Sequence, residues 1–284
     1  MTTVYLNQLN NTKMSKKSSS SSGVWQSLFA PIAIIVALVV AYYLYMNIMG
    51  NPVNFEGGNP KGHPIQGNYL GIMYKGGMIV PILMAIVLVL IIFVLERFIT
   101  LRKIQGKGSL NVFLAKLKSL LADDKIEDAI TACDNQKGSL ANVMRAGLER
   151  YRNLESDKEL EKDQKITSMK QALEEATALE LPMLSKNMVI LSTIASISVL
   201  IGLIGTVLGM IRAFAALAQS GAPDALALST GISEALVNTA FGITGSTLAI
   251  IFFNYFSSTI DGYTFKIDEA GFSLTQTFAA SVRK

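Results

Sequence analysis

Histidine and cysteine are almost absent from this sequence of 284 residues, because His63 and Cys133 are the only two. A Ser-His-Asp or Cys-His arrangement needs a histidine beside the nucleophile, yet these two residues fall in segments that we predict on opposite sides of a membrane. No cluster of histidine, cysteine or carboxylate residues has metal-ligand spacing, and no G-x-x-x-x-G-K-[ST] segment is present to bind phosphates. The sequence therefore indicates a protein that is not an enzyme, with no catalytic residues, metal or cofactor.

Charged residues are also scarce, at 16% of the chain, whereas hydrophobic residues make up 50%. Soluble domains usually carry roughly 25% charged residues. A membrane-spanning helix needs about 20 mainly apolar residues to cross about 30 Å of hydrocarbon. Four runs meet this requirement, at residues 28–49, 78–95, 188–211 and 235–256. The predicted fold class is an all-α integral membrane protein with four transmembrane helices and a helical cytoplasmic domain.

The first apolar run resembles a signal peptide because three lysines precede it. Its apolar core is longer than the roughly 7–15 residues of a signal peptide, and no small-residue cleavage site closes it cleanly. We interpret it as an uncleaved anchor, with cleavage near Ala41 or Gly50 as the alternative. Met14 offers a second plausible translation start.

The distribution of positive charge predicts the orientation, since lysine and arginine accumulate in cytoplasmic segments. With the N-terminus inside, 22 of the 25 positive residues are cytoplasmic, and only Lys61, Lys75 and Arg212 lie outside. Both termini are therefore expected in the cytoplasm. The sequence pI of about 9.0 reflects this topology and does not indicate nucleic-acid binding.

Composition and periodicity divide the chain into nine segments. In order, these are a flexible cytoplasmic leader (1–27), an extra N-terminal transmembrane helix (28–49), a periplasmic loop (50–77), a second transmembrane helix (78–98), a helical cytoplasmic domain (99–187), a third transmembrane helix (188–214), a periplasmic loop (215–232), a fourth transmembrane helix (233–257) and a cytoplasmic C-terminal tail (258–284). The first loop is rich in Gly, Asn and Pro, which predicts no regular structure there.

Two features of the cytoplasmic domain can be predicted more closely. Cys133 lies in a helical repeat of apolar residues, so we expect it to be a small buried side chain. Residues 166–184 contain good helix formers, and this helix is expected to run directly into the third transmembrane helix, with a kink at Pro182.

Stripes of small and weakly polar residues follow one face of each of the last two apolar helices. The stripe on the third helix comprises Ser192, Ala195, Val199, Gly202, Thr206, Gly209 and Ala213, and Gly205 and Gly209 also form a G-x-x-x-G pair. The stripe on the fourth comprises Ala235, Thr239, Gly242, Ser246 and Ala249. Such stripes either let two helices pack closely or line a wet passage with hydroxyl groups, and the stripes alone leave both interpretations open.

Depth favours a shared polar layer. Thr206 lies about eight residues inside the outer end of its helix and Thr239 about five, which puts both roughly 8–12 Å below the outer surface. Glu234 is the only carboxylate at or within the membrane boundary of these two helices. An ionisable group at this depth marks a functional site, but a glutamate in a first turn is also an ordinary partner of the helix dipole. It lies about 140° around the helix from Thr239, so we expect it to face a neighbouring helix or subunit.

At these residues the sequence resembles a known family. Residues 200–214 (LIGLIGTVLGMIRAF) are similar to the GLLGTVxGMIxxF signature of the MotA/TolQ/ExbB proton-channel family, nearest to ExbB, and residues 231–242 (GISEALVNTAFG) to its GIxEALxxTAxG segment. The weaker matches are Gly76-Gly77, Pro81, Glu96-Arg97, Ala146-Gly147-Leu148 and Asn254. The resemblance covers residues 76–261. Two departures are Val199 and Leu248, where many members have proline.

The resemblance implies a pentamer of this chain in the bacterial inner membrane, surrounding the helices of a small ExbD- or TolR-like single-span partner. That partner would supply a proton-accepting aspartate, while Thr206 and Thr239 line the pore and Glu234 supports them. The residues expected on the pore or packing face are Gly202, Gly205, Gly209, Gly242 and Ser246.

The resemblance leaves three functions open. The leading one is a channel subunit of a motor, driven by the proton-motive force, that energises a TonB-like protein for outer-membrane transport. A TolQ-like subunit for envelope maintenance shares both motifs and differs in its partner. A passive membrane scaffold, whose stripes only pack helices, needs no proton flux.

Overall fold

The computed structural model describes residues 20–60, 62–155, 160–218 and 225–281, with side chains described from residue 28 onward. In this part of the chain the regular structure is helical, apart from an isolated bridge between Phe55 and Pro64. The elements in chain order are α2 (Ser20–Tyr43), the π-helical η1 (Leu44–Met49), the 3-10 helices η2 (Pro52–Asn54) and η3 (Glu56–Gly58), α3 (Tyr69–Tyr74), the 3-10 helix η4 (Gly77–Ile79), α4 (Val80–Gln105), α5 (Leu110–Ala122), α6 (Ile126–Gln136), α7 (Ser139–Glu155), α8 (Lys162–Ser185), α9 (Met188–Ala218) and α10 (Ala225–Ser281).

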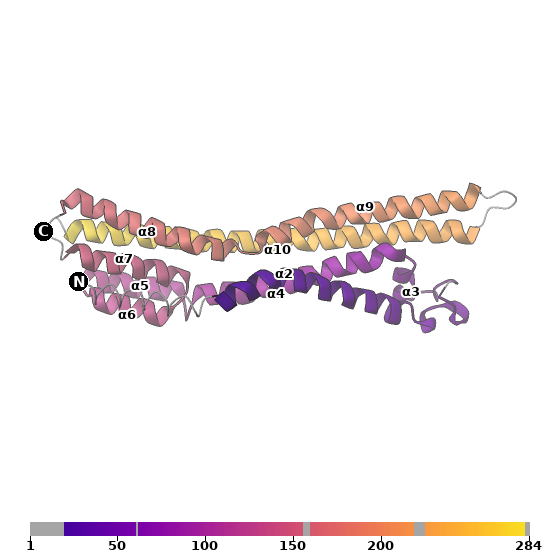
Figure 1. Cartoon of the computed structure of the whole chain (residues 1–284), viewed down its shortest axis with the longest axis horizontal. Helices are drawn as coiled ribbons and strands as arrows, with labels where there is room; N and C mark the ends of the chain where they lie inside the picture. Colours follow the sequence, from indigo (N-terminus) through magenta and orange to yellow (C-terminus); the bar gives the residue numbers. More distant parts are fainter. Residues whose placement is uncertain (1–19, 61, 156–159, 219–224, 282–284) are drawn as a thin grey trace, which may run out of the picture. The chain divides into compact units, whose positions relative to one another are not determined.

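Four helical segments of the described chain are long and apolar enough to cross a membrane. These segments are Leu28–Met49, Gly77–Ala122, Lys162–Ala218 and Ala225–Ser281, and they include most of α2 and all of α4, α9 and α10 (Figure 1). The prediction of an all-α membrane protein with four spanning helices is thus confirmed. By its contacts the chain divides into unit 1, which holds Met1–Ile92 and Ile194–Leu248, and unit 2, which holds Phe93–Thr193 and Ala249–Lys284.

Unit 2 is a helical domain in which α5, α6, α7 and α8 pack against their neighbours in chain order. Their buried faces repeat at three- and four-residue spacing, as amphipathic helices require. Cys133 is 2% exposed within this core, as expected for a small buried residue. Burial raises the pKa of its thiol to about 12, so the thiol stays protonated and unreactive at neutral pH.

Residues 258–281 are not a separate tail, because α10 continues through them without a break to Ser281. The second half of α10 has an apolar face of its own that is buried in unit 2, formed by Ile267, Ala270, Leu274 and Phe278. The ring of Phe278 meets that of Tyr151 on α7 edge to face, with centroids 4.7 Å apart. Burial of this face explains why the helix persists beyond its apolar half.

The helix of residues 166–184 does not run directly into the third apolar helix, which corrects our expectation. Pro182 lies inside α8, and the chain leaves helical geometry only at Lys186 and Asn187, where φ of Asn187 is +61°. A fully buried Arg97 donates to the Leu184 carbonyl at 3.2 Å and pairs with Glu96, which also accepts from Asn187 at 3.2 Å. These long-range contacts hold the break in place.

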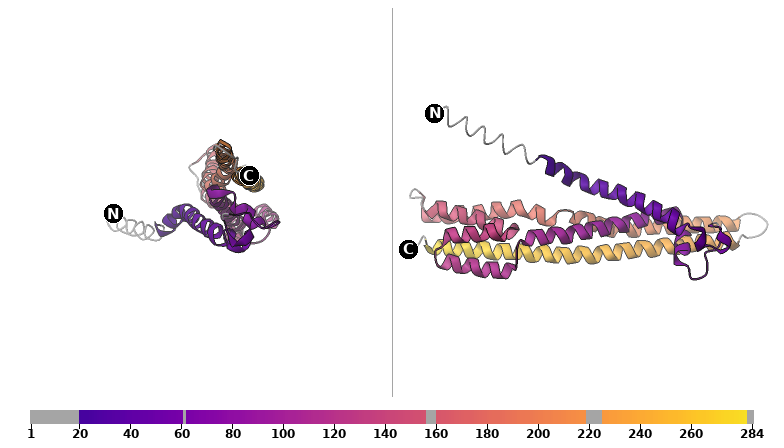
Figure 2. Two further views of the ribbon diagram at one scale, coloured as in Figure 1. Left: turned by 90° about the vertical axis from the view of Figure 1, so that its right-hand side faces the viewer. Right: turned by 90° about the horizontal axis from the view of Figure 1, so that it is seen from below.

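The loop after α2 in unit 1 is folded, contrary to the prediction of no regular structure. Asn54 donates to the carbonyls of Ile48 and Met49, at 2.7 and 2.9 Å, and accepts from Asn68 at 3.0 Å. Short helices therefore fold back onto the end of η1, at the loop end of α2 (Figure 2). The loop has few backbone hydrogen bonds from regular secondary structure, and the buried side chain of Asn54 provides partners for backbone groups at the end of η1 instead.

Candidate functional site

The helices α9 and α10 of unit 1 run side by side and touch along their small-residue stripes (Figure 1). A Cβ atom added to Gly202 would lie 3.0 Å from the Cα of Gly242, and one added to Gly209 would lie 2.8 Å from the backbone nitrogen of Ala235. Side chains larger than hydrogen would force the backbones apart at these points. Close packing of the two helices therefore accounts for the glycines in this part of the seam.

The same seam brings the two predicted threonines together. The hydroxyls of Thr206 and Thr239 are hydrogen-bonded to each other. Each hydroxyl has a single hydrogen, so one of the pair donates to the other, and the accepting hydroxyl donates to a carbonyl of its own helix, that of Gly202 at 3.1 Å for Thr206 or that of Ala235 at 3.0 Å for Thr239. Both side chains are half-buried, so this pair of hydroxyls lies at the edge of the seam rather than within it.

The remaining predicted stripe residues have packing contacts. Ser246 donates to the Ala195 carbonyl on α9. Gly205 lies against the side chain of Asn238. A Cβ atom added to Gly205 would lie 2.6 Å from the Cβ atom of Asn238. The first of these contacts joins the two helices further along the seam, and the second lies directly beside the threonine pair.

Glu234 faces neighbouring helices of its own chain. Its side chain is 5% exposed and pairs with Arg212 on α9, whose side chain is 56% exposed. The carboxylate also lies against Gly77, where an added Cβ would collide with it. Gly77 has φ of +74°, so both the backbone conformation and the lack of space require glycine there.

Sequence reasoning missed Arg212 as the partner of Glu234. Arg212 is the only charged residue of α9, and Glu234 is the only one in the part of α10 that belongs to unit 1. Both lie near the ends joined by residues 219–224. Their similar depth and opposite charges could have predicted this ion pair from the sequence.

Asn238 is a second residue that sequence reasoning missed. It is 0% exposed and donates through Nδ2 to the Gly76 carbonyl at 3.0 Å, just before α4. Its Oδ1 is buried and accepts no hydrogen bond from the described residues. The available signal was its position one turn after Glu234, which places both polar side chains on one face of α10.

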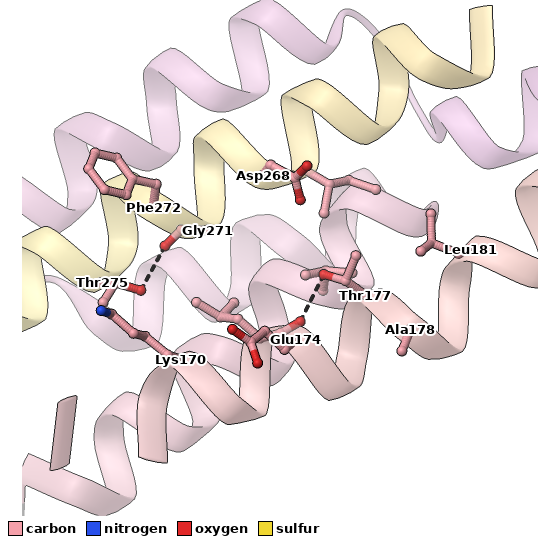
Figure 3. Close-up of a pocket in the computed structure, with 12 residues that line it drawn as sticks. Lys170, Glu174, Thr177, Ala178, Leu181, Asp268, Gly271, Phe272 and Thr275 are labelled. Carbon is pink, nitrogen blue, oxygen red and sulfur yellow. Dashed lines mark hydrogen bonds between the residues drawn. The ribbon is translucent and has the colours of Figure 1, made fainter. Parts of the chain in front are cut away.

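A cavity of about 470 Å³ lies in unit 2 and is lined mainly by residues of α8 and α10 (Figure 3). Its threonines are occupied within their own helices, since Thr177 donates to the Leu173 carbonyl and Thr275 to that of Gly271. Lys170, Glu174 and Asp268 also line it. No group of three or more metal-binding side chains occurs anywhere in the described chain.

The fold and the site define a class of protein. The described chain is an all-α membrane protein whose last two apolar helices join through glycines and a pair of threonine hydroxyls. A hydroxyl both donates and accepts a hydrogen bond, so this pair can contact water or a carboxylate without carrying charge itself.

Comparisons with known proteins are consistent with this class. Residues 135–269 match the sequence profile of the MotA/TolQ/ExbB proton channel family. The chain is 40% identical over 94 residues to a biopolymer transport protein ExbB-like 3 of Synechocystis sp., covering 32% of this chain and 45% of that protein. It is 29% identical over 137 residues to the biopolymer transport protein ExbB of Pseudomonas putida (48% and 41%) and 26% identical over 153 residues to the Tol-Pal system protein TolQ of Pseudomonas aeruginosa (54% and 66%).

The chain thus resembles the MotA/TolQ/ExbB proton channel family, which the match of residues 135–269 and these relatives support. It spans less than half of the length of the first two of these relatives.

Proposed function

We propose that this chain is the channel-forming subunit of a motor driven by the proton-motive force in a bacterial inner membrane. The observation that carries the proposal is the contact between the Thr206 and Thr239 hydroxyls at the edge of the α9–α10 seam. The segment 135–269 that matches the proton channel family contains both residues. The two threonines, supported by Glu234, form the polar layer of the pore.

The chemistry of the pore requires a second protein. Threonine hydroxyls do not hold a proton as a charged carrier, and Glu234, the only carboxylate in this part of α10, is engaged by Arg212. A small single-span partner of the ExbD or TolR kind supplies the aspartate that takes up and releases the proton. Each proton that crosses yields about 2.3 kcal/mol per 100 mV of membrane potential.

Assembly and topology complete the proposal. Five copies of the chain surround the partner's helices, with both termini in the cytoplasm and residues 50–77 and 215–232 on the periplasmic side. Lipid contacts the outer faces, which carry exposed apolar side chains, such as Ile35 and Val39 of α2 at 61% and 65% exposure. The division of positive charge along the sequence supports this orientation.

The motor energises a TonB-like protein that acts on outer-membrane transport, and the ExbB relatives are named as biopolymer transport proteins. A TolQ-like role in envelope maintenance is the second candidate. It is favoured by the TolQ relative, whose match covers 54% of this chain. The identity of the small single-span protein that co-purifies with this chain distinguishes the two candidates.

Proton flux into proteoliposomes tests the proposal. The complex of this chain with its co-purifying single-span protein is expected to conduct protons, and the double variant Thr206→Val, Thr239→Val is expected to assemble normally and conduct almost none. Thr230→Val is the matched control, because the Thr230 hydroxyl donates to the Leu226 carbonyl of its own helix at 2.8 Å. Unchanged flux through the double variant would leave the passive scaffold as the better account.

A further inference from the structure

Asn238 occupies the position in the seam next to the threonine pair. It precedes Thr239 on α10, and it packs on Gly205, which precedes Thr206 on α9. A Cβ atom added to Gly205 would lie 2.6 Å from both Cβ and Cγ of Asn238. The asparagine side chain therefore fills the space that the glycine leaves, directly beside the contact between the two hydroxyls.

The same side chain reaches a third helix. Its amide donates to the carbonyl of Gly76, 162 residues away in sequence, at the turn that precedes α4. This turn has little room to shift, because a Cβ atom on Gly76 would lie 2.7 Å from the Val237 side chain. One buried side chain thus connects α9, α10 and the start of α4, all within unit 1.

Stability alone does not explain an asparagine at this position. Its Oδ1 is buried and accepts no hydrogen bond from the residues that the structure describes. A buried acceptor without a donor destabilises a fold, and this cost offsets the stabilisation that the hydrogen bond to the Gly76 carbonyl provides. Buried asparagines between helices are known instead to fix one register, at some cost in stability.

We propose that Asn238 is a positioning residue for the Thr206–Thr239 pair, which fixes the register of α9 on α10 and ties this register to the start of α4. This inference rests on the proposed function of the threonine pair. A slip of one residue moves a helical side chain by about 1.5 Å along the axis and about 100° around it, which separates two hydroxyls in contact.

The first test replaces Asn238 with leucine, which has a similar size and no amide. We expect the Asn238→Leu complex to assemble at the parent level with an unchanged melting temperature in detergent, while proton flux falls about tenfold, the effect of one lost hydrogen bond. Ser198→Ala is the matched control. Ser198 is also 0% exposed in this seam, lies against Gly245, and has an Oγ that no described residue binds. Its flux should equal that of the parent.

The second test separates positioning from a general structural role. In a Thr239→Val background, Asn238→Leu should lower the residual flux much less than tenfold, because its effect passes through a hydroxyl that is already gone. Equal losses in both backgrounds, a loss of the same size in Ser198→Ala, or normal flux in Asn238→Leu would each overturn the positioning role. If the Asn238→Leu complex does not assemble, the Asn238→Ala variant is tested instead. Failure of both variants to assemble would also overturn the positioning role.

The tests distinguish this inference from the function on which it rests. Normal flux in the Thr206→Val, Thr239→Val variant refutes the proposed pore and the positioning role together. Normal flux in Asn238→Leu, combined with loss of flux in the threonine variant, refutes only the role of Asn238.

Discussion

The same substitution, glycine to alanine, is expected to have opposite effects at two positions of the last two long helices. A Cβ atom at Gly209 would lie 2.8 Å from the backbone nitrogen of Ala235 and from the carbonyl oxygen of Gly231, whereas ordinary contact begins near 3.4 Å. Backbone atoms of a neighbouring helix cannot rotate away, so α9 and α10 must separate. Gly262 on α10 has no heavy atom within 4 Å of its Cβ position.

Overpacking of a tight contact costs about 1–3 kcal/mol. Alanine in a helix interior returns up to about 1 kcal/mol relative to glycine. Gly209→Ala should therefore lower the free energy of unfolding by about 1–2 kcal/mol, and Gly262→Ala should raise it by about 0.5–1 kcal/mol. Thermal loss of helical circular dichroism, measured for both variants in one detergent, compares them directly. A Gly209→Ala variant at least as stable as the parent would refute the close packing of α9 on α10.

Three further predictions concern the rest of the chain. Arg97→Leu should destabilise the purified protein by about 3–5 kcal/mol in denaturant titration, because it removes the buried partner of Glu96. Cys133 should not react with a maleimide at neutral pH until the protein is unfolded, since its thiol stays protonated below a pKa of about 12; rapid labelling of the native protein would contradict its burial. In a Cys133→Ser background, a cysteine at Gly58 should react with an impermeant reagent added to intact spheroplasts, whereas a cysteine at Lys125 should not.

The sequence was sufficient to predict those parts of the fold that depend on local pattern. The four spanning helices follow from the length of apolar runs, and the contact of Thr206 with Thr239 follows from two matched stripes at similar depth. The continuation of α10 could also have been predicted. Its buried residues from Ile267 to Phe278 recur at helical spacing. This segment has fewer apolar residues than the first half of α10, so the helical pattern is weaker there.

Features that depend on contacts between distant residues were not predictable in the same way. The break between α8 and α9 depends on Asn187 in a left-handed conformation and on Arg97, 90 positions earlier in the sequence. The hydrogen bond from Asn238 to Gly76 likewise joins residues 162 positions apart. No local periodicity encodes such pairs, because each residue taken alone is compatible with many partners.

The central claim is that the hydroxyl groups of Thr206 and Thr239, rather than their shape, serve the proton pathway. Two double variants separate these properties, since valine keeps the branched shape without the hydroxyl and serine keeps the hydroxyl without the methyl group. The most direct measurement is proton flux through proteoliposomes that contain each variant in complex with its single-span partner at equal subunit content. We predict that the double serine variant retains most of the parent flux and that the double valine variant loses it; equal flux through the two variants would contradict the claim.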